Sequence, residues 1–177
     1  MNKENEVLDN DILEITNDVD VQQIISLNKF IFLSVVSFGT YEIWWIYKAW
    51  KFYQQKEKLD IIPAARAIFA IFFLNSLFVK SLEFAKEKGY QGNYSSISLC
   101  VGFFVVNALY RLPDPFWLIS IMSFVFLIPP FKALNFAKMN SDDLIVNEQI
   151  SYSSRQIILI VIGTIFWALV LFGMTLK

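Results

Sequence analysis

Histidine is absent from the 177-residue sequence, and cysteine occurs once, as Cys100. The lack of histidine excludes a Ser-His-Asp triad. Together with the single cysteine it excludes the usual zinc ligand sets and any intrachain disulfide. Walker loops, dinucleotide fingerprints and carboxylate pairs at a metal-ligand spacing are missing too. We therefore expect no catalytic residues, no cofactor and no metal site, and we predict that the protein is not an enzyme.

An excess of charge of either sign is also missing. Lys and Arg number 15 and Asp and Glu number 16, which gives a formal net charge of −1. Without a basic surplus no long-range field attracts nucleic acid, so we expect no nucleic-acid partner.

Residues 1–28 are predicted to form an acidic tail. Five carboxylates precede residue 15, against Lys3 as the one cation there: Glu4, Glu6, Asp9, Asp11 and Glu14. Apolar residues at helical spacing in 21–27 predict a short interfacial helix at the end of this tail. An acidic arm that binds a protein partner is the alternative.

Apolar residues are abundant: 56% of the chain is hydrophobic and 17% is aromatic, more than a soluble domain of this size needs. They gather in five segments of a membrane domain at 29–177, namely about 30–50, 61–80, 94–111, 116–137 and 156–176. A helix of about 20 residues crosses a bilayer, and the alternation typical of a membrane barrel is missing. The sequence predicts an all-α integral membrane helical bundle with four or five membrane segments, in contact with the lipid bilayer.

The first segment runs from apolar residues into aromatic rings and then lysines, the order met on leaving a bilayer. We predict that five rings form an interfacial aromatic anchor: Tyr41, Trp44, Trp45, Tyr47 and Trp50. An aromatic cage for a ligand cation is the alternative. Gly39 and Glu42 interrupt this segment, so it either crosses with a kink or is re-entrant. The side of the N-terminus depends on which of these holds.

The same stretch carries a motif. It reads Phe38-Gly39-Thr40-Tyr41, Trp44-Trp45-Ile46-Tyr47-Lys48 and Trp50-Lys51, followed by Pro63, Arg66-Ala67 and Phe69. This run resembles a family of small multi-pass bacterial membrane proteins with the pattern F-G-x-Y-x-x-[YW]-W-x-Y-K-x-W-K and then P-x-x-R-A-x-F. The resemblance implies a multi-pass protein of the bacterial inner (plasma) membrane. It implies no catalytic residue, because the family has no assigned chemistry.

The connector at 48–60 holds the densest group of cations in the chain, Lys48, Lys51, Lys56 and Lys58. Basic loops are retained on the cytoplasmic side of a membrane, so we predict that this connector is cytoplasmic. The same four lysines are candidates for contacts with anionic lipid headgroups. As orientation determinants alone they need no ligand.

Two charges inside the predicted segments suggest an intramembrane ion pair. Glu42 lies six residues before Lys48. Arg66 lies six residues after Asp60. At 1.5 Å per residue both side chains would lie about 9 Å below the same interface, and pairing would lower the cost of burying each charge. We therefore predict that Glu42 and Arg66 pair.

The function that these features favour is a structural, accessory or interaction role in the membrane, with a protein partner or a second copy of the chain as candidate partners. A small membrane transporter or channel is the alternative. It would need polar and charged residues of several segments to meet in a hydrated cavity.

Overall fold

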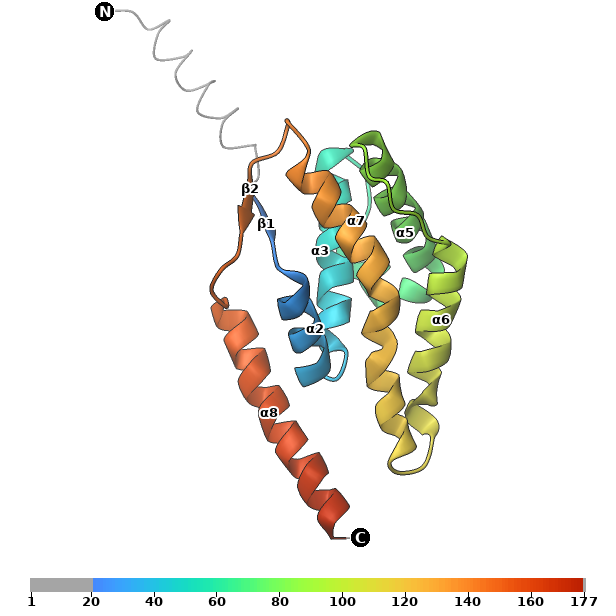
Figure 1. Ribbon diagram of the computed structural model, residues 1–177, viewed down its shortest axis with the longest axis vertical. Coiled ribbons are helices and arrows are strands. Elements are labelled where there is room, and N and C mark those ends of the chain that lie inside the picture. The colour runs from blue at the N-terminus through green and yellow to red at the C-terminus, as the bar shows by residue number, and fades with distance from the viewer. Residues whose placement is uncertain (1–20, 177) are drawn as a thin grey trace, which may run out of the picture.

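The computed structural model describes residues 21–176, which are mostly helical (Figure 1). The elements are β1 (Gln22–Ile24), α2 (Leu27–Val36), α3 (Thr40–Lys56), α4 (Pro63–Ile68), α5 (Ala70–Glu87), α6 (Ser96–Ala108), the 3-10 helices η1 (Leu109–Arg111) and η2 (Phe116–Leu127), α7 (Ile128–Met139), β2 (Val146–Glu148) and α8 (Ser154–Thr175). The all-α prediction is confirmed at this level. Two helices, Phe116–Met139 and Ser154–Thr175, are long and apolar enough to cross a membrane.

The first predicted segment is a helical hairpin. Helix α2 ends at Val36, and the chain reverses at Phe38 and Gly39, both with positive φ, before α3 begins at Thr40. The ring centroids of Phe30 and Trp45 lie 5.9 Å apart, whereas residues 15 positions apart in one straight helix would be separated by about 22 Å. Segment 30–50 is therefore a hairpin of two helices and not one continuous helix, which is the backbone geometry that the re-entrant alternative requires.

The second predicted segment, 61–80, is also interrupted. Pro63 occupies the first turn of α4, which ends at Ile68. Phe69 follows, and α5 begins at Ala70. Phe69 has φ −92° and ψ 40°, outside the helical region, so the two helices differ in direction. Helix α5 continues to Glu87, beyond the expected end at residue 80, because Leu77, Phe78, Ser81, Phe84 and Ala85 give it one continuous buried face.

Segments 94–111 and 116–137 pack against each other as α6–η1 and η2–α7. Pro129 and Pro130 do not interrupt the second of these rods, because they lie in the first turn of α7, where the missing N–H groups would be unpaired in any helix. The 3-10 turns of η2 end at Leu127, and α7 continues the same rod.

Helix α8 stands apart from the rest of the bundle and is attached through α2 (Figure 1). A capping box of Ser153 and Gln156 starts it. The backbone of α2 approaches Gly163 so closely that a Cβ there would lie 2.1 Å from the Val36 carbonyl oxygen. Four residues on, the indole of Trp167 donates a hydrogen bond to the Val35 carbonyl at 3.2 Å.

The interfacial helix expected for 21–27 is not formed. Residues 1–20 of the predicted tail lie outside the described residues. Instead β1 pairs in parallel with β2, with Gln22 opposite Val146 and Ile24 opposite Glu148. Nothing in the local pattern predicts this pairing, because the partner strand lies more than a hundred residues further along the chain.

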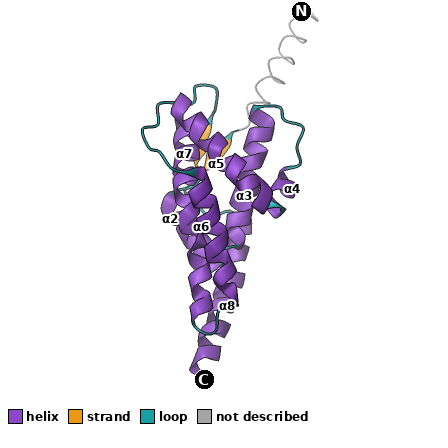
Figure 2. Ribbon diagram, turned by 90° about the vertical axis from the view of Figure 1, so that its right-hand side faces the viewer, coloured by secondary structure: helices purple, strands orange, loops and turns teal. Residues whose placement is uncertain are grey.

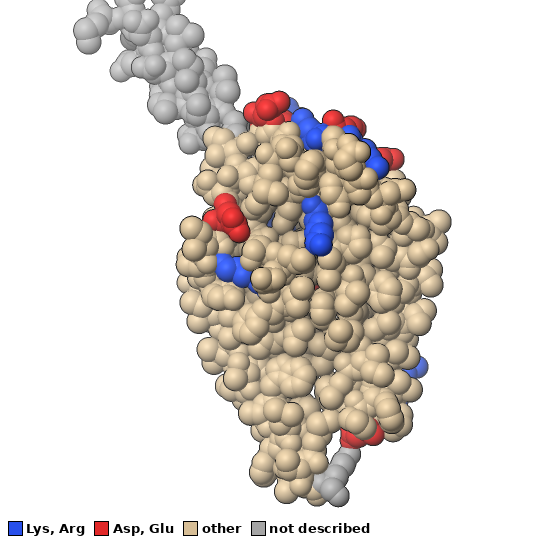
Figure 3. Space-filling model, viewed as in Figure 1, with Lys and Arg blue, Asp and Glu red and all other residues tan. Residues whose placement is uncertain are grey.

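Charge is concentrated at one end of the bundle, hereafter the charged end (Figure 3). The loops 57–62, 88–95 and 140–153 lie toward this end, and the short turn at 112–115 lies at the opposite end (Figures 1 and 2). The core lies beneath the charged end, where Phe30 and Phe131 stack with centroids 4.5 Å apart and Trp50 and Phe78 are fully buried.

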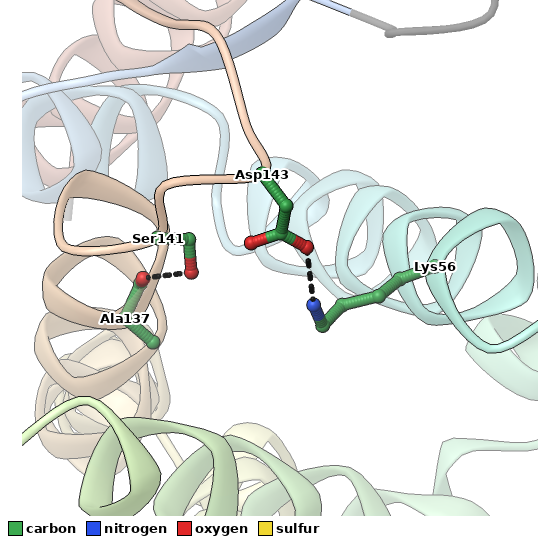
Figure 4. A network of polar contacts seen from close by, with 4 residues as sticks. All are labelled: Lys56, Ala137, Ser141 and Asp143. Carbon is green, nitrogen blue, oxygen red and sulfur yellow. Dashed lines mark hydrogen bonds and ion pairs between the residues drawn. The ribbon is translucent and has the colours of Figure 1, made fainter.

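The loop after α7 is tied to the charged end by two contacts (Figure 4). Ser141 donates a hydrogen bond to the Ala137 carbonyl at 2.7 Å, which closes the C-terminus of α7. The Lys56 ammonium lies 3.0 Å from an Asp143 carboxylate oxygen. This hydrogen bond from Lys56 holds the pKa of Asp143 below its ordinary value.

We expect Lys56→Met to lower stability most above about pH 4, and we expect this loss to shrink as the pH falls through the lowered pKa of Asp143. A carboxylate with a lowered pKa stabilises the fold above its ordinary pKa of about 3.9, and this contribution is lost as the pH falls through the lowered value. The pair is exposed, so we expect the difference to stay below about 1 kcal/mol. Melting temperatures in detergent at pH 6 and pH 3 measure it. Lys86→Met, on an exposed lysine at the end of α5, is the control. An equal loss at both pH values would exclude the Asp143 contact as the cause.

Candidate functional site

One face of α3 lines a groove with a volume of about 720 Å³. Its α3 residues follow helical spacing: Thr40, Tyr41, Trp44, Trp45, Lys48, Ala49, Lys51, Phe52 and Gln55. Residues three, four and seven positions apart share a helix face, so the aromatic and lysine pattern of the sequence is one stripe along α3. We call this cavity the cationic groove.

Two further helices complete the cationic groove. Helix α7 contributes Phe131, Leu134, Asn135 and Lys138, again on one face. Helix α8 contributes its first turns, from Ser154 to Leu159, and residues 21–25 around β1 close the remaining side. The groove therefore exists because the α2–α3 hairpin and the β1–β2 pair hold α8 away from α7.

The groove is positively charged. Among the described residues, four cations line it, Lys48, Lys51, Lys138 and Arg155, and no Asp or Glu does. Lys138 is 8% exposed, donates a hydrogen bond to the Gln22 side chain at 3.1 Å and lies over the Phe52 ring at 4.2 Å. Little solvent screens a charge at this depth, so the charge keeps most of its field.

Trp44 links two walls of the cationic groove. The Lys48 ammonium lies 5.6 Å from the centroid of this ring, and the Arg155 guanidinium lies 5.8 Å from it. Lys48 belongs to α3 and Arg155 to the first turn of α8, so the indole is contacted by cations from two helices. Both distances are within the range of a cation–π interaction.

Only some of the five rings predicted to form the aromatic anchor lie at the protein surface. Tyr41, Trp45 and Trp50 are buried in the protein and cannot reach a headgroup layer. Tyr47 is half-buried and packs on Trp44, which is 37% exposed. The prediction treated all five rings alike, but helical periodicity turns Tyr41, Trp45 and Trp50 inward.

The lysines of the connector separate into two pairs. Lys48 and Lys51 line the cationic groove, whereas Lys56 pairs with Asp143 and Lys58 follows the C-terminus of α3, with φ 49°. The connector itself begins later than expected, because α3 continues through Lys56.

The expected Glu42–Arg66 ion pair is not formed. Glu42 is 1% exposed, and its two carboxyl oxygens accept from the Ser123 hydroxyl at 3.1 and 3.0 Å. Arg66 lies over the Trp50 ring at 4.3 Å. Trp50 is eight residues beyond Glu42 in α3, about 12 Å along the axis. The depth estimate failed because it ended the helix at Lys48.

Two groove cations were not identified as site residues from the sequence, Lys138 and Arg155. Lys138 looked like an ordinary charge at a segment end. Arg155 carried a usable signal, since the first turn of a helix disfavours cations and the rest of α8 has no charge. A cation kept at such a position indicates a local role.

Two features of the described residues could serve a chemical role: the cationic groove and the buried carboxyl group of Glu42. No group of three His, Cys, Asp or Glu side chains among them could hold a metal ion. The groove can bind an anion, and its apolar end, with Phe131, Leu134 and Leu159, can contact hydrocarbon.

Comparisons of the chain with protein-family models, curated proteins and solved structures found no match.

Proposed function

We propose that this chain is a multi-pass integral membrane protein of the bacterial inner (plasma) membrane, with a non-enzymatic structural, accessory or interaction role. The observation that carries the proposal is α8. It is apolar over 22 residues, yet only 6% of its most apolar window is buried. A helix that is apolar on all sides is buried in a core or spans a membrane, and the first option does not fit an exposed helix.

Exposed apolar residues on the other helices support the same proposal. Ile68 and Phe72 of α4 and α5 are 74% and 75% exposed, and Ile97 of α6 is 67% exposed. Patches of this kind are rare on soluble monomers. The body below the charged end is almost free of charge on the face seen in Figure 3.

In the proposed topology three rods cross the bilayer: α6–η1, η2–α7 and α8. The hairpin α2–α3 and the pair α4–α5 enter from the charged end and return to it, which gives five membrane segments. Non-helical backbone inside a membrane must be paired within the protein. The α2–α3 turn meets this condition, because the N–H groups of Phe38, Gly39 and Thr40 bond to carbonyls of Val35, Ser34 and Ser37.

This topology predicts that the charged end, including connector 48–60, faces the cytoplasm. Arg111 is the one Lys or Arg of the described residues at the opposite turn, while lysines gather at the charged end. We expect an impermeant maleimide to label Leu112→Cys in intact cells and Gln55→Cys only after permeabilisation, both in a Cys100→Ala background. Labelling of Gln55→Cys alone in intact cells would reverse the orientation.

Extraction tests the membrane location independently of orientation. We expect alkaline carbonate to leave the protein in the membrane pellet and detergent to release it, because its apolar helices would be solvated by lipid. Release by carbonate would refute the proposal. The resemblance to the family of small multi-pass membrane proteins agrees with the proposal and remains a prediction.

A transporter or channel is the second candidate, favoured by the buried polar groups around Glu42. The Ser34 hydroxyl is fully buried and has no hydrogen-bond partner among the described residues. Ser34 and Glu42 both flank the α2–α3 turn. Such groups inside a membrane are costly and typical of ion or proton pathways. Proton or cation flux in proteoliposomes that is abolished by Glu42→Gln would support transport, and the absence of flux would exclude it for the ions tested.

A further inference from the structure

The cationic groove opens at the boundary between the charged end and the apolar body. On the face seen in Figure 3, Lys or Arg side chains stand among uncharged ones below the charged end. Lys48 and Arg155 lie on opposite walls, and the indole of Trp44 lies within 6 Å of both cations. Tryptophan rings settle at the level of lipid headgroups, so this part of the groove is at headgroup depth if the chain spans a membrane as proposed.

The charge of the groove selects the sign of its ligand. In the part of the lining that the structure describes, four cations and no carboxylate are present, so the cations repel one another and raise the local concentration of anions. Arg presents a planar fork of N–H donors that matches phosphate oxygens, and Lys adds a compact positive charge. A phosphate group between Lys48 and Arg155 would offset the cost of holding these charges close together.

The apolar end of the groove selects a ligand with hydrocarbon. Phe131, Leu134 and Leu159 line it. Beyond Leu159, the apolar residues of α8 continue to the opposite end of the bundle, with Ile162 and Phe166 about half exposed. Acyl chains that leave the groove along α8 would remain in contact with apolar side chains, whereas a soluble anion would leave this part unused.

We propose that the cationic groove binds an anionic phospholipid, with the headgroup phosphate between Lys48 and Arg155 beside Trp44 and the acyl chains along α8. Lys138 and Lys51 supply further positive charge around the headgroup. This inference rests on the proposed membrane location and names the ligand class of that membrane protein. Zwitterionic lipids fit less well, because their own cation would enter a groove that already holds four.

Native mass spectrometry of the full chain in neutral detergent tests the proposal. With phosphatidylglycerol and phosphatidylcholine added in equal amounts, we expect selective retention of phosphatidylglycerol. Lys48→Gln combined with Arg155→Gln should lower this retention about tenfold or more, since each basic residue near an anionic lipid contributes about 1 kcal/mol. Lys86→Gln combined with Lys88→Gln, two lysines outside the groove lining, is the matched control and should retain the lipid as the unmodified chain does.

Other outcomes overturn the proposal. Equal retention of the two lipids, or an equal loss in the control, would mean that the groove is not selective or that general surface charge binds the lipid. Displacement of phosphatidylglycerol by millimolar glycerol 3-phosphate would show that the headgroup alone is bound and that the acyl chains contribute nothing. Lys48→Arg combined with Arg155→Lys keeps the charge and should retain the lipid. It therefore separates loss of the cations from loss of the fold.

Failure of the membrane proposal gives a different result. The carbonate experiment tests only whether the protein is held in the membrane. The lipid experiment uses the purified chain in detergent, so it tests lipid selectivity separately. Membrane retention without lipid selectivity would leave the proposed function standing and remove the proposed ligand.

Discussion

Gly163→Ala is expected to lower the melting temperature of the protein in detergent by about 2–12 °C. The new Cβ would lie 2.1 Å from the Val36 carbonyl oxygen and 2.9 Å from its carbon. These are backbone atoms, so the methyl group can be accommodated only if α8 moves away from α2. That movement would break the Trp167 hydrogen bond to Val35 and the stacking of Trp167 on Phe38, whose centroids are 4.8 Å apart. Overpacking costs about 1–3 kcal/mol, and each kcal/mol shifts the midpoint by about 2–4 °C at this chain length.

Gly173→Ala is the matched control on the same helix. Among the described residues, no atom beyond the neighbouring residues and the backbone of its own helix lies within 4 Å of a Cβ built there, so we expect helix propensity to decide the effect. Alanine is favoured over glycine in a helix by up to about 1 kcal/mol, and we expect the midpoint to stay constant or rise. If Gly163→Ala also raised the midpoint, the close approach of α8 to α2 would be contradicted.

Glu42→Ala is expected to destabilise the fold by about 2–4 kcal/mol, because it leaves a cavity and removes the acceptor of the Ser123 hydroxyl. Glu42→Gln should cost less, since it keeps the shape of the side chain and one acceptor oxygen. A double-mutant cycle of Glu42→Ala with Ser123→Ala should show a coupling of about 1–3 kcal/mol. Reversible unfolding in mixed detergent micelles measures these differences.

A second double-mutant cycle, which combines Glu42→Ala with Arg66→Gln, distinguishes the observed contacts from the ion pair expected from the sequence. Arg66 lies over Trp50, and Glu42 accepts from Ser123, so the two substitutions should be additive within about 0.5 kcal/mol. A coupling energy above about 1 kcal/mol would instead support a Glu42–Arg66 ion pair and contradict the contacts described above.

The sequence predicted best those features of the fold that depend on residues close together in the chain. The last segment was expected at 156–176 and α8 covers Ser154–Thr175, because one uninterrupted apolar run defines it. Gly39 marked a break in the first segment, but only the structure shows that Phe38 also takes a positive φ and that the chain reverses there. A short deviation from helix carries little signal when apolar residues continue on both sides.

The cationic groove illustrates the opposite case. The aromatic rings and lysines of its α3 stripe could be recognised in the sequence. From the sequence alone, these rings could be interpreted either as an interfacial anchor or as a cage for a ligand cation. Lys138 and Arg155 come from α7 and α8, and no spacing in the sequence relates them to Lys48. Their convergence depends on how three helices pack, which is set by long-range contacts such as that between Gly163 and Val36.

The parallel pair β1–β2 also constrains the order of events during synthesis. Lys29 donates hydrogen bonds to the carbonyls of Gln149 and Ile150, and Lys29 and Gln149 are 120 residues apart in the chain. At about 5–20 residues per second, translation of that interval takes about 6–24 s. Throughout this time the start of the α2–α3 hairpin lacks its partner strand. This segment is made early relative to α8, yet it reaches its final contacts late, because it depends on residues made much later.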